Sequence, residues 1–296
     1  MHIPCFILNS FMKYKIIILF TFVGLIASAV NPDNKYIKEP EEAILEVVYS
    51  RKAITDTTMR DNRYFLDDVI LRIGKNKSMF CGEKKIWEDS LLKVDNSAYH
   101  AIWKSTYEKD RRAAGFLGGY YAGYVYKDFT INHYTEYDLF DMENWKYVED
   151  LKTPEWTITD SVKNIIGYEC FKATTDFKGR QWTAWFTPEI PISDGPWKLH
   201  GLPGLILEAY DKSHDYEFEA KGIRSSGLGL VGYMEYKWDY SIVTRDDFFK
   251  RWWKAKHENT GAKVRAIMGI KSDKPVSFKR VPKYDREEID YDHSLK

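Results

Sequence analysis

The run from residue 187 to residue 211, TPEIPISDGPWKLHGLPGLILEAYD, constrains this chain more than any other stretch. Its first three prolines fix their own backbone angles and push the preceding residues towards extended geometry. Pro203-Gly204 then places proline second and glycine third in a four-residue turn, which is the residue pattern of a type II turn. Leu205-Ile206-Leu207 is apolar on both strand faces, which favours a covered position in a sheet. The sequence therefore predicts a stiff loop, a turn and a buried strand, in that order.

Much of the remaining chain is typical of antiparallel β-structure. It holds ten Trp, twenty-one Tyr and sixteen Phe, and aromatic residues suit half-buried sheet surfaces. Residues 168–175 and 181–187 flank the turn sequence DFKG, which is the clearest hairpin signal. Between residues 216 and 220 apolar and acidic residues alternate, as in a strand with one solvated face. Further strands are expected over residues 42–54, 67–73, 78–81 and 236–243.

Two helices are expected beside these strands. The pair Asn96-Ser97 can cap a helix whose apolar residues recur at helical spacing through Tyr107. Thr244, with Asp247 three residues later, forms an imperfect capping box before an apolar stripe. That second helix, which also carries basic residues, is expected to dock on the sheet, and the alternative is a basic amphipathic helix on a membrane surface. Its stripe consists of Phe248, Phe249, Trp252 and Trp253.

These patterns predict a mainly β (α+β) protein. The preferred architecture is a strongly curved antiparallel sheet packed on one or two helices, similar to periplasmic lipoprotein-carrier folds, and the alternative is a β-sandwich. The expected organisation is a signal peptide, a flexible N-terminal tail, a single β-rich domain and a polar C-terminal tail with a disordered end. These parts cover residues 1–29, 30–41, 42–260 and 261–296.

The N-terminus has the three parts of a secretory signal. Two lysines, at positions 13 and 15, precede an uncharged apolar run over residues 16–26, and Ala27-Ser28-Ala29 supplies the small residues of a cleavage site. Translation can start at Met1 or at Met12. A membrane anchor is the alternative, but eleven apolar residues are too short to cross a bilayer, and no second stretch is long enough. The chain is therefore expected to be exported to the periplasm or outer cell envelope, without a transmembrane span.

The composition argues against several kinds of partner and cofactor. Loss of two lysines from 44 basic residues leaves 42 against 44 acidic ones, so the mature chain lacks the basic field that nucleic acid requires. Cys81 and Cys170 can either form a disulfide in an oxidising compartment or remain free. The seven histidines are scattered without a metal-ligand spacing, so no metal or other cofactor is expected.

The segment around residues 201–206 resembles the GLPGLI family of exported bacterial proteins. Those residues match the motif without a substitution, and WFTPEIPISDGPWKLH and IGYECFKATT precede it. The resemblance is sharpest over residues 165–211 and weaker from about 42 to 225. It implies secretion or a periplasmic location, and it supplies no catalytic residue. One distant association, with an accessory domain of a glycan-cleaving amidase, implies an accessory role. The motif residues are Gly201, Leu202, Pro203, Gly204, Leu205 and Ile206.

Three functions remain open. The preferred hypothesis is a non-enzymatic envelope protein that binds or carries an apolar or glycan ligand, with the loop from Thr187 to Gly204 at the mouth of the site. One alternative is a hydrolase, or the accessory domain of a glycan-processing enzyme, in which Asp194 and His200 form an acid–base pair. The other is a structural partner in an outer-membrane complex. Aromatic residues bring large contact area at low entropic cost, so the candidate ligand-binding residues are Trp182, Trp185, Asp194, Trp197 and His200.

Overall fold

A computed structural model describes residues 37–291, apart from residues 62, 142, 235–239 and 258–284. The predicted signal peptide, residues 1–29, lies outside the described residues, as does the first half of the strand expected over residues 236–243. Within the described part of the chain, no helix has both the length and the apolar character needed to cross a membrane.

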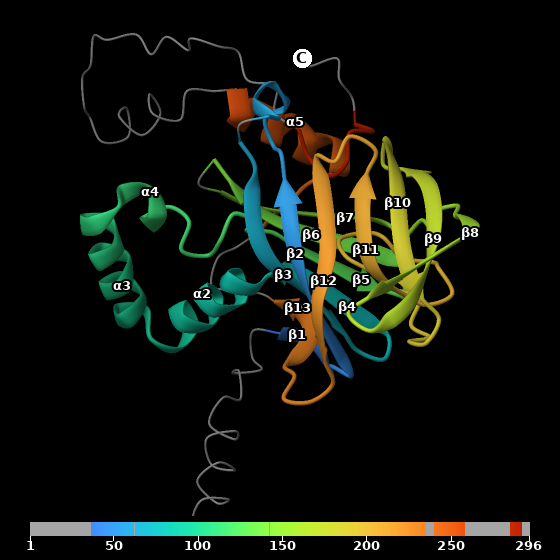
Figure 1. The fold of residues 1–296 in the computed structure, drawn as a ribbon. Helices are drawn as coiled ribbons and strands as arrows, with labels where there is room; N and C mark the ends of the chain where they lie inside the picture. The colour runs from blue at the N-terminus through green and yellow to red at the C-terminus, as the bar shows by residue number, and fades with distance from the viewer. Residues whose placement is uncertain (1–36, 62, 142, 235–239, 258–284, 292–296) are drawn as a thin grey trace, which may run out of the picture.

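The described chain consists mainly of strands, with a few helices (Figure 1). The strands are β1 (Ile37–Glu42), β2 (Leu45–Ala53), β3 (Phe65–Ile73), β4 (Lys77–Gly82), β5 (Tyr124–Asp128), β6 (His133–Phe140), β7 (Glu143–Asp150), β8 (Thr157–Ile165), β9 (Tyr168–Phe177), β10 (Arg180–Thr187), β11 (Leu205–Asp211), β12 (Tyr216–Arg224), β13 (Leu230–Met234) and β14 (Ser241–Ile242). The helices are α2 (Glu83–Val94), α3 (Asn96–Lys109), α4 (Arg111–Ala114), α5 (Arg245–His257) and the 3-10 turn η2 (Thr57–Met59).

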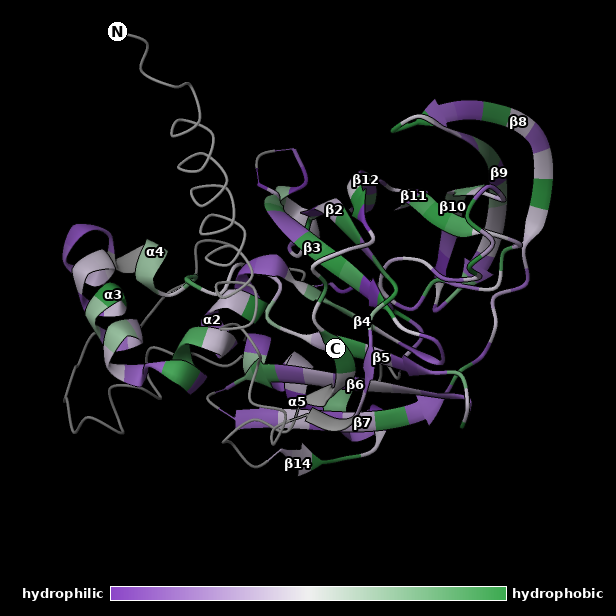
Figure 2. Cartoon of the chain, turned by 90° about the horizontal axis from the view of Figure 1, so that it is seen from below, coloured by the Kyte–Doolittle hydropathy of each residue, from purple (hydrophilic) through white to green (hydrophobic). Residues whose placement is uncertain are grey.

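Twelve strands form one sheet in the order β14-β7-β6-β5-β4-β3-β2-β12-β11-β10-β9-β8. Neighbours pair antiparallel, except that the short β14 runs parallel to β7. The sheet is strongly curved and does not close, so β5, β6 and β7 lie below β2, β3 and β12 in Figure 2. This confirms the predicted curved antiparallel sheet over the sandwich. The fold class follows from the many short strands in which apolar and polar residues alternate. Each such strand has one apolar face, and other parts of the chain must cover that face.

The concave side of the sheet holds the main core. Its largest fully buried side chain, Trp182, lies on β10 on the same face as Ala184 and Phe186. That shared face confirms the two-residue alternation predicted for residues 181–187, since successive strand residues point to opposite faces. The hairpin across DFKG is also confirmed, because Arg180 pairs with Phe177. Tyr216, Phe218 and Ala220 of β12 are buried in the same core.

The proline-rich loop fills this concave core instead of standing at its mouth. Trp197, Leu199 and Leu202 are at most 2% exposed and pack in the same cluster as Trp182. The three residues after the motif glycine, residues 205–207, are fully buried on β11, as predicted. The expectation that the loop borders an open site is therefore wrong, because the loop itself is the material that fills the hollow.

The motif does not form the predicted type II turn. The Gly204 N–H donates to the Leu202 carbonyl at 2.8 Å, and the Leu205 N–H donates to Ile190 across the loop at 3.0 Å. Gly204 is required for a different reason: a Cβ there would lie 2.1 Å from the Thr187 carbonyl oxygen. The residue pattern was correct for a tight turn, but the closing hydrogen bond comes from a partner that is distant in sequence.

The helices agree with the predictions in position more than in detail. Helix α3 forms where expected, but its cap is Asp95, whose side chain accepts from the Ala98 N–H at 2.8 Å. Helix α5 docks on the sheet, with Phe248 and Phe249 buried against β6 and β7. Docking on the sheet is thus confirmed over the membrane-surface alternative. The Thr244 hydroxyl accepts from the Asp247 N–H at 3.1 Å, which is half of a capping box.

Both predicted tails contain ordered structure. Residues 37–41 of the predicted N-terminal tail, together with Glu42, form β1, which pairs with β13 as a separate two-stranded sheet. Residues 285–291, expected to be part of a disordered end, cross the molecule beside α5, with Glu287 and Glu288 at most 5% exposed. The expectation failed there because a charged segment was read as solvated, whereas its charges have partners inside the fold.

Cys81 and Cys170, the two cysteines beyond the predicted signal peptide, do not form a disulfide. Cys81 on β4 and Cys170 on β9 are free, buried and in different core clusters. Burial raises the pKa of the Cys170 thiol to about 11 and raises the pKa of the Cys81 thiol further, so both stay protonated at neutral pH. They act as small apolar core residues.

Candidate functional site

The predicted aromatic site residues are mostly core residues. Trp182 is fully buried and Trp197 is 2% exposed, and their ring centroids lie 5.6 Å apart. Trp185 lies on the opposite face of β10, half-buried, with the Lys163 Nζ 4.4 Å from its ring centroid. Trp182 and Trp197 are therefore inaccessible to a ligand in this structure, and they pack the core instead.

Asp194 and His200 are both buried in the loop, but each has other partners. Asp194 forms an ion pair with the fully buried Lys127, whose Nζ also donates to the Gly195 carbonyl at 2.7 Å. Burial lowers the pKa of Lys127, and the Asp194 carboxylate opposes that shift. The pair attaches the loop to β5, which is a structural role.

The His200 imidazole is held in its neutral form. Its Nδ1 lies 3.1 Å from the Lys198 carbonyl and 3.0 Å from the Tyr134 hydroxyl. Burial, and then the nearby charge of Lys127, lower the pKa of His200 to about 4. No hydrogen bond joins His200 to Asp194 among the described residues. The proposed acid–base pair is therefore not assembled.

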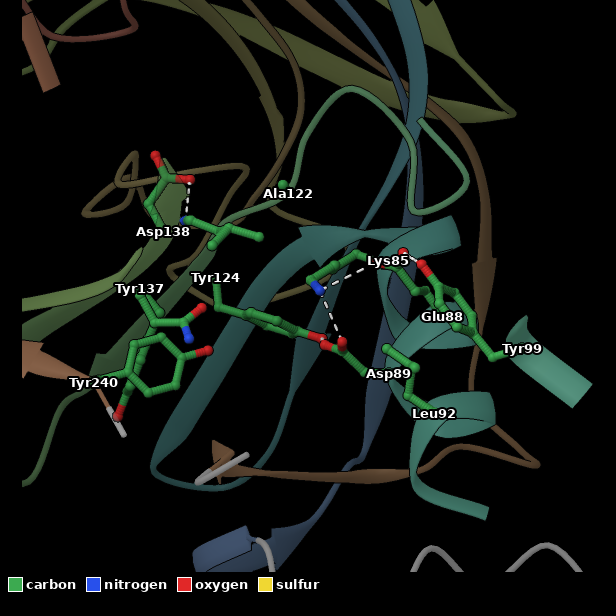
Figure 3. Close-up of a pocket in the computed structure, with 12 residues that line it drawn as sticks. Lys85, Glu88, Asp89, Leu92, Tyr99, Ala122, Tyr124, Tyr137, Asp138 and Tyr240 are labelled. Atoms are coloured by element: carbon green, nitrogen blue, oxygen red, sulfur yellow. Dashed lines mark hydrogen bonds and ion pairs between the residues drawn. The ribbon is translucent and has the colours of Figure 1, made fainter. Parts of the chain in front are cut away.

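A cavity of about 270 Å³ lies outside this core, between α2 and the strands β5 and β6 (Figure 3). We call it the tyrosine pocket. Lys85, Glu88 and Asp89 project into it from α2, and Tyr137 and Tyr240 face them from the other side. The residues that line it are Lys85, Glu88, Asp89, Leu92, Tyr99, Ala122, Tyr124, Tyr137, Asp138, Leu139, Asn144 and Tyr240.

The helical wall of the pocket is an ordered array of charges. Lys85 donates to Asp89 at 2.7 Å and to Glu88 at 3.2 Å, because residues three and four apart share one helix face. Burial opposes the charge on Lys85, but the two carboxylates outweigh it and raise the pKa of Lys85. Burial raises the pKa of Asp89, and Lys85 opposes that shift. The Tyr124 hydroxyl donates to Asp89, which connects β5 to this wall.

The remaining walls are aromatic. Tyr137 and Tyr240 meet edge to face, with centroids 4.9 Å apart, and Tyr124 stacks beside Tyr126 at 6.1 Å. The Tyr99 hydroxyl donates to Glu88 at 3.0 Å, and burial together with that carboxylate raises the pKa of Tyr99 to about 12. The pocket thus combines flat apolar ring faces with carboxylates, an amide and one ammonium group.

Sequence reasoning missed this pocket. The charged face at positions 85, 88 and 89 was visible only once α2 was known to be a helix. The four tyrosines come from α3, β5, β6 and the segment before β14, and nothing in the sequence indicated that they meet. No group of three metal-ligating side chains was found in the described part of the chain. The pocket therefore has the groups to bind a polar ligand.

Comparisons with known proteins add a family resemblance and a distant structural one. Residues 175–208 match the model of a family described as a protein of unknown function (Porph_ging), and this stretch includes β10 and the motif. Comparison with curated proteins gave no match. The fold is similar to solved structures of PNGF-II, in the P21 space group (TM-score 0.46, 15% identity, 72% of this chain and 34% of that chain) and in the C2 space group (0.46, 15%, 71% and 33%). The chain thus spans about a third of the length of those chains.

Proposed function

We propose that this protein is a non-enzymatic binding protein of the cell envelope, and that the tyrosine pocket takes a neutral, hydroxyl-rich ligand such as a sugar. Export is supported by the signal-like residues 1–29, and assignment to the GLPGLI type by residues 201–206 within the matched stretch. The observation that carries the binding role is the pairing of ring faces with carboxylates around one cavity.

The chemistry of the walls selects among ligand classes. An apolar ligand would displace water from the charged groups of α2 without replacing the hydrogen bonds that this water makes, which is costly. A simple anion would be repelled by the carboxylates of Glu88, Asp89 and Asp138, and a compact cation would be repelled by the Lys85 ammonium group. Hydroxyl groups both donate and accept, so they can satisfy carboxylates, the Asn144 amide and the Lys85 ammonium at once. The cavity is near the lower end of small-molecule sites, which favours one or two sugar rings over a lipid chain.

Saturation-transfer NMR against a panel of neutral mono- and oligosaccharides tests this proposal. At least one probe should bind, and Tyr240→Ala and Glu88→Gln should each weaken its binding at least tenfold, corresponding to about 1.4 kcal/mol. Lys221→Ala is the matched control, since that lysine pairs with Asp68 on an exposed surface away from the pocket. Its affinity should equal that of the unmodified protein.

Three outcomes would contradict the proposal. Binding that survives both pocket substitutions would place the ligand elsewhere. Binding of only charged or apolar probes would overturn the ligand class. A shortened saccharide product in the NMR spectra would replace the binding role with catalysis, in which the raised pKa of Asp89 suits a proton donor.

A further inference from the structure

Residues 285–291, Asp-Arg-Glu-Glu-Ile-Asp-Tyr, which we call the strap, lie in a groove of the fold as an irregular extended segment. The strap is drawn red beside α5 in Figure 1. Glu288 is 1% exposed and Glu287 is 5% exposed, although glutamates are almost never fully buried without partners. The groove must therefore supply those partners.

Glu288 occupies a socket built by two cations and a hydroxyl. Its Oε1 accepts from the Lys198 Nζ at 2.7 Å and from the Tyr147 hydroxyl at 3.1 Å, and its Oε2 accepts from Arg245 at 2.5 Å. Lys198 is fully buried and comes from the proline-rich loop, whereas Arg245 comes from α5. Burial disfavours the carboxylate, but Lys198 and Arg245 outweigh it and lower the pKa of Glu288.

Two further arginines hold the rest of the strap. Arg51 on β2 pairs with Glu287, with a second contact from its Nε at 3.2 Å. Arg180 on β10 donates to the Arg286 carbonyl at 3.0 and 2.5 Å and pairs with Asp285 at 2.7 Å. Arg180 donates to a backbone carbonyl as well as pairing with a carboxylate. The groove therefore recognises an extended peptide backbone and not only a charge.

The strap also places groups of its own in the body of the fold. Arg286 donates to Glu136 at 2.7 Å and to Asp138 at 2.8 Å. The Tyr291 ring stacks on Phe249 of α5, with centroids 4.6 Å apart and planes 4° apart. The Ile289 N–H donates to the Lys178 carbonyl at 2.9 Å. Acidic, basic, acidic, acidic and aromatic positions are therefore each matched by a separate feature of the groove.

These contacts differ in kind from those of a core segment. Five of the seven strap residues are charged, so a detached strap would be well solvated. The buried ion pairs therefore contribute more to the specificity of strap binding than to its net free energy. A second cavity, of about 540 Å³, adjoins the groove and is lined by Lys178, Arg245 and Asp290. Of the two cations that hold Glu288, Arg245 thus borders solvent-accessible space, whereas Lys198 is fully buried.

We propose that the groove beneath the strap is a binding site for acidic peptide segments, which residues 285–291 occupy in cis. The partner is an extended segment of another protein with two adjacent glutamates followed three residues later by an aromatic residue, as Tyr291 follows Glu288. The attached strap competes with a partner peptide at an effective concentration of about millimolar. A partner peptide must therefore either overcome this competition or bind a protein whose strap has detached from the groove.

The test uses the full chain with a fluorescent, end-capped peptide of sequence DREEIDY. The peptide should show little binding to the unmodified protein at micromolar concentration and should bind the variant E287Q/E288Q, whose own strap is weakened. A control peptide with both glutamates replaced by glutamine should bind that variant at least tenfold more weakly. Adding Arg245→Gln should weaken the acidic peptide by a similar factor. The second variant, Tyr291→Ala, loosens the strap without changing its charges and should also admit the peptide.

A measurement on the unmodified protein keeps the test independent of variant folding. Millimolar DREEIDY should displace the strap and accelerate hydrogen exchange of the Ile289 amide, whereas the glutamine peptide should not. The proposal is overturned if both peptides bind equally, or if neither folded variant binds the acidic peptide and Ile289 exchange is unchanged. Either result would leave the strap as a permanent structural segment.

Discussion

The concave core and the helical arm formed by α2, α3 and α4 are both rich in aromatic residues, yet they use them in opposite ways. In the core, Trp182 and Trp197 are at most 2% exposed and belong to one cluster of buried side chains. In the arm, α3 has no buried residue, and Trp103 and Tyr107 are 37% and 39% exposed while stacking on each other at 5.0 Å. Residue type alone therefore does not distinguish a packing role from a surface role.

Polar groups show the same contrast. Lys127 and Lys198 are fully buried in the core region and are held by carboxylates from other segments. Lys85 and Glu88, on the arm, border the tyrosine pocket and retain some access to solvent. Buried charges that lose a partner are expensive, whereas accessible ones can be satisfied by water or ligand. Substitutions in the core are thus expected to lower the free energy of unfolding strongly, and substitutions in the arm are expected to lower it little.

The largest expected difference lies between two tryptophans. Trp182→Ala should lower the free energy of unfolding by about 4 kcal/mol, because it leaves a large cavity in a close-packed core. Trp103→Ala should lower it by less than about 1 kcal/mol, because much of that ring already faces solvent. Urea denaturation of both variants measures this. Equal losses would contradict the division between core and arm.

A smaller effect is expected at the motif glycine. Gly204→Ala should lower the free energy of unfolding by about 3 kcal/mol, since the new methyl group would lie 2.1 Å from the Thr187 carbonyl oxygen and the loop must shift. Gly222→Ala, on β12, is the control, because a Cβ there meets nothing within 4 Å. Thermal melting compares the two variants. Unchanged melting of Gly204→Ala would show that the close approach does not constrain the motif.

The smallest of these effects depends on pH. The folded-state pKa of His200, about 4, lies below its ordinary value of 6.5, so the unfolded chain binds the proton first as pH falls. Stability is fully present above pH 6.5 and declines towards pH 4, with a loss of about 2 kcal/mol by pH 5. His200→Asn keeps a donor for the Lys198 carbonyl but cannot titrate. Its stability should change less over pH 7 to 5, as measured by denaturation, and parallel curves would disprove the assignment to His200.

The sequence predicted strands and helices well where local pattern decides them. The hairpin across DFKG and the apolar face of α5 depend on periodicity and turn residues, and both were correct. The turn at Gly204 and the strap were not predicted correctly, because the Ile190 carbonyl and the Lys198 ammonium that hold them come from distant positions. The tyrosine pocket was missed for the same reason. Tyr124 contacts Asp89, and Tyr240 contacts Tyr137, only after the chain has folded.

The sequence by itself determined the β-rich class, the stiffness of the loop and the burial of residues 205–207, because proline geometry and hydrophobic alternation act over a few residues. Only the tertiary structure decided where charges and rings would lie. It buried Asp194 and Lys198 among partners from other strands, left Trp103 half-exposed and drew the acidic strap into a groove. The stability of a buried charge depends on partners that the fold brings together from distant positions. The pattern of residues along a short stretch of sequence does not specify those partners.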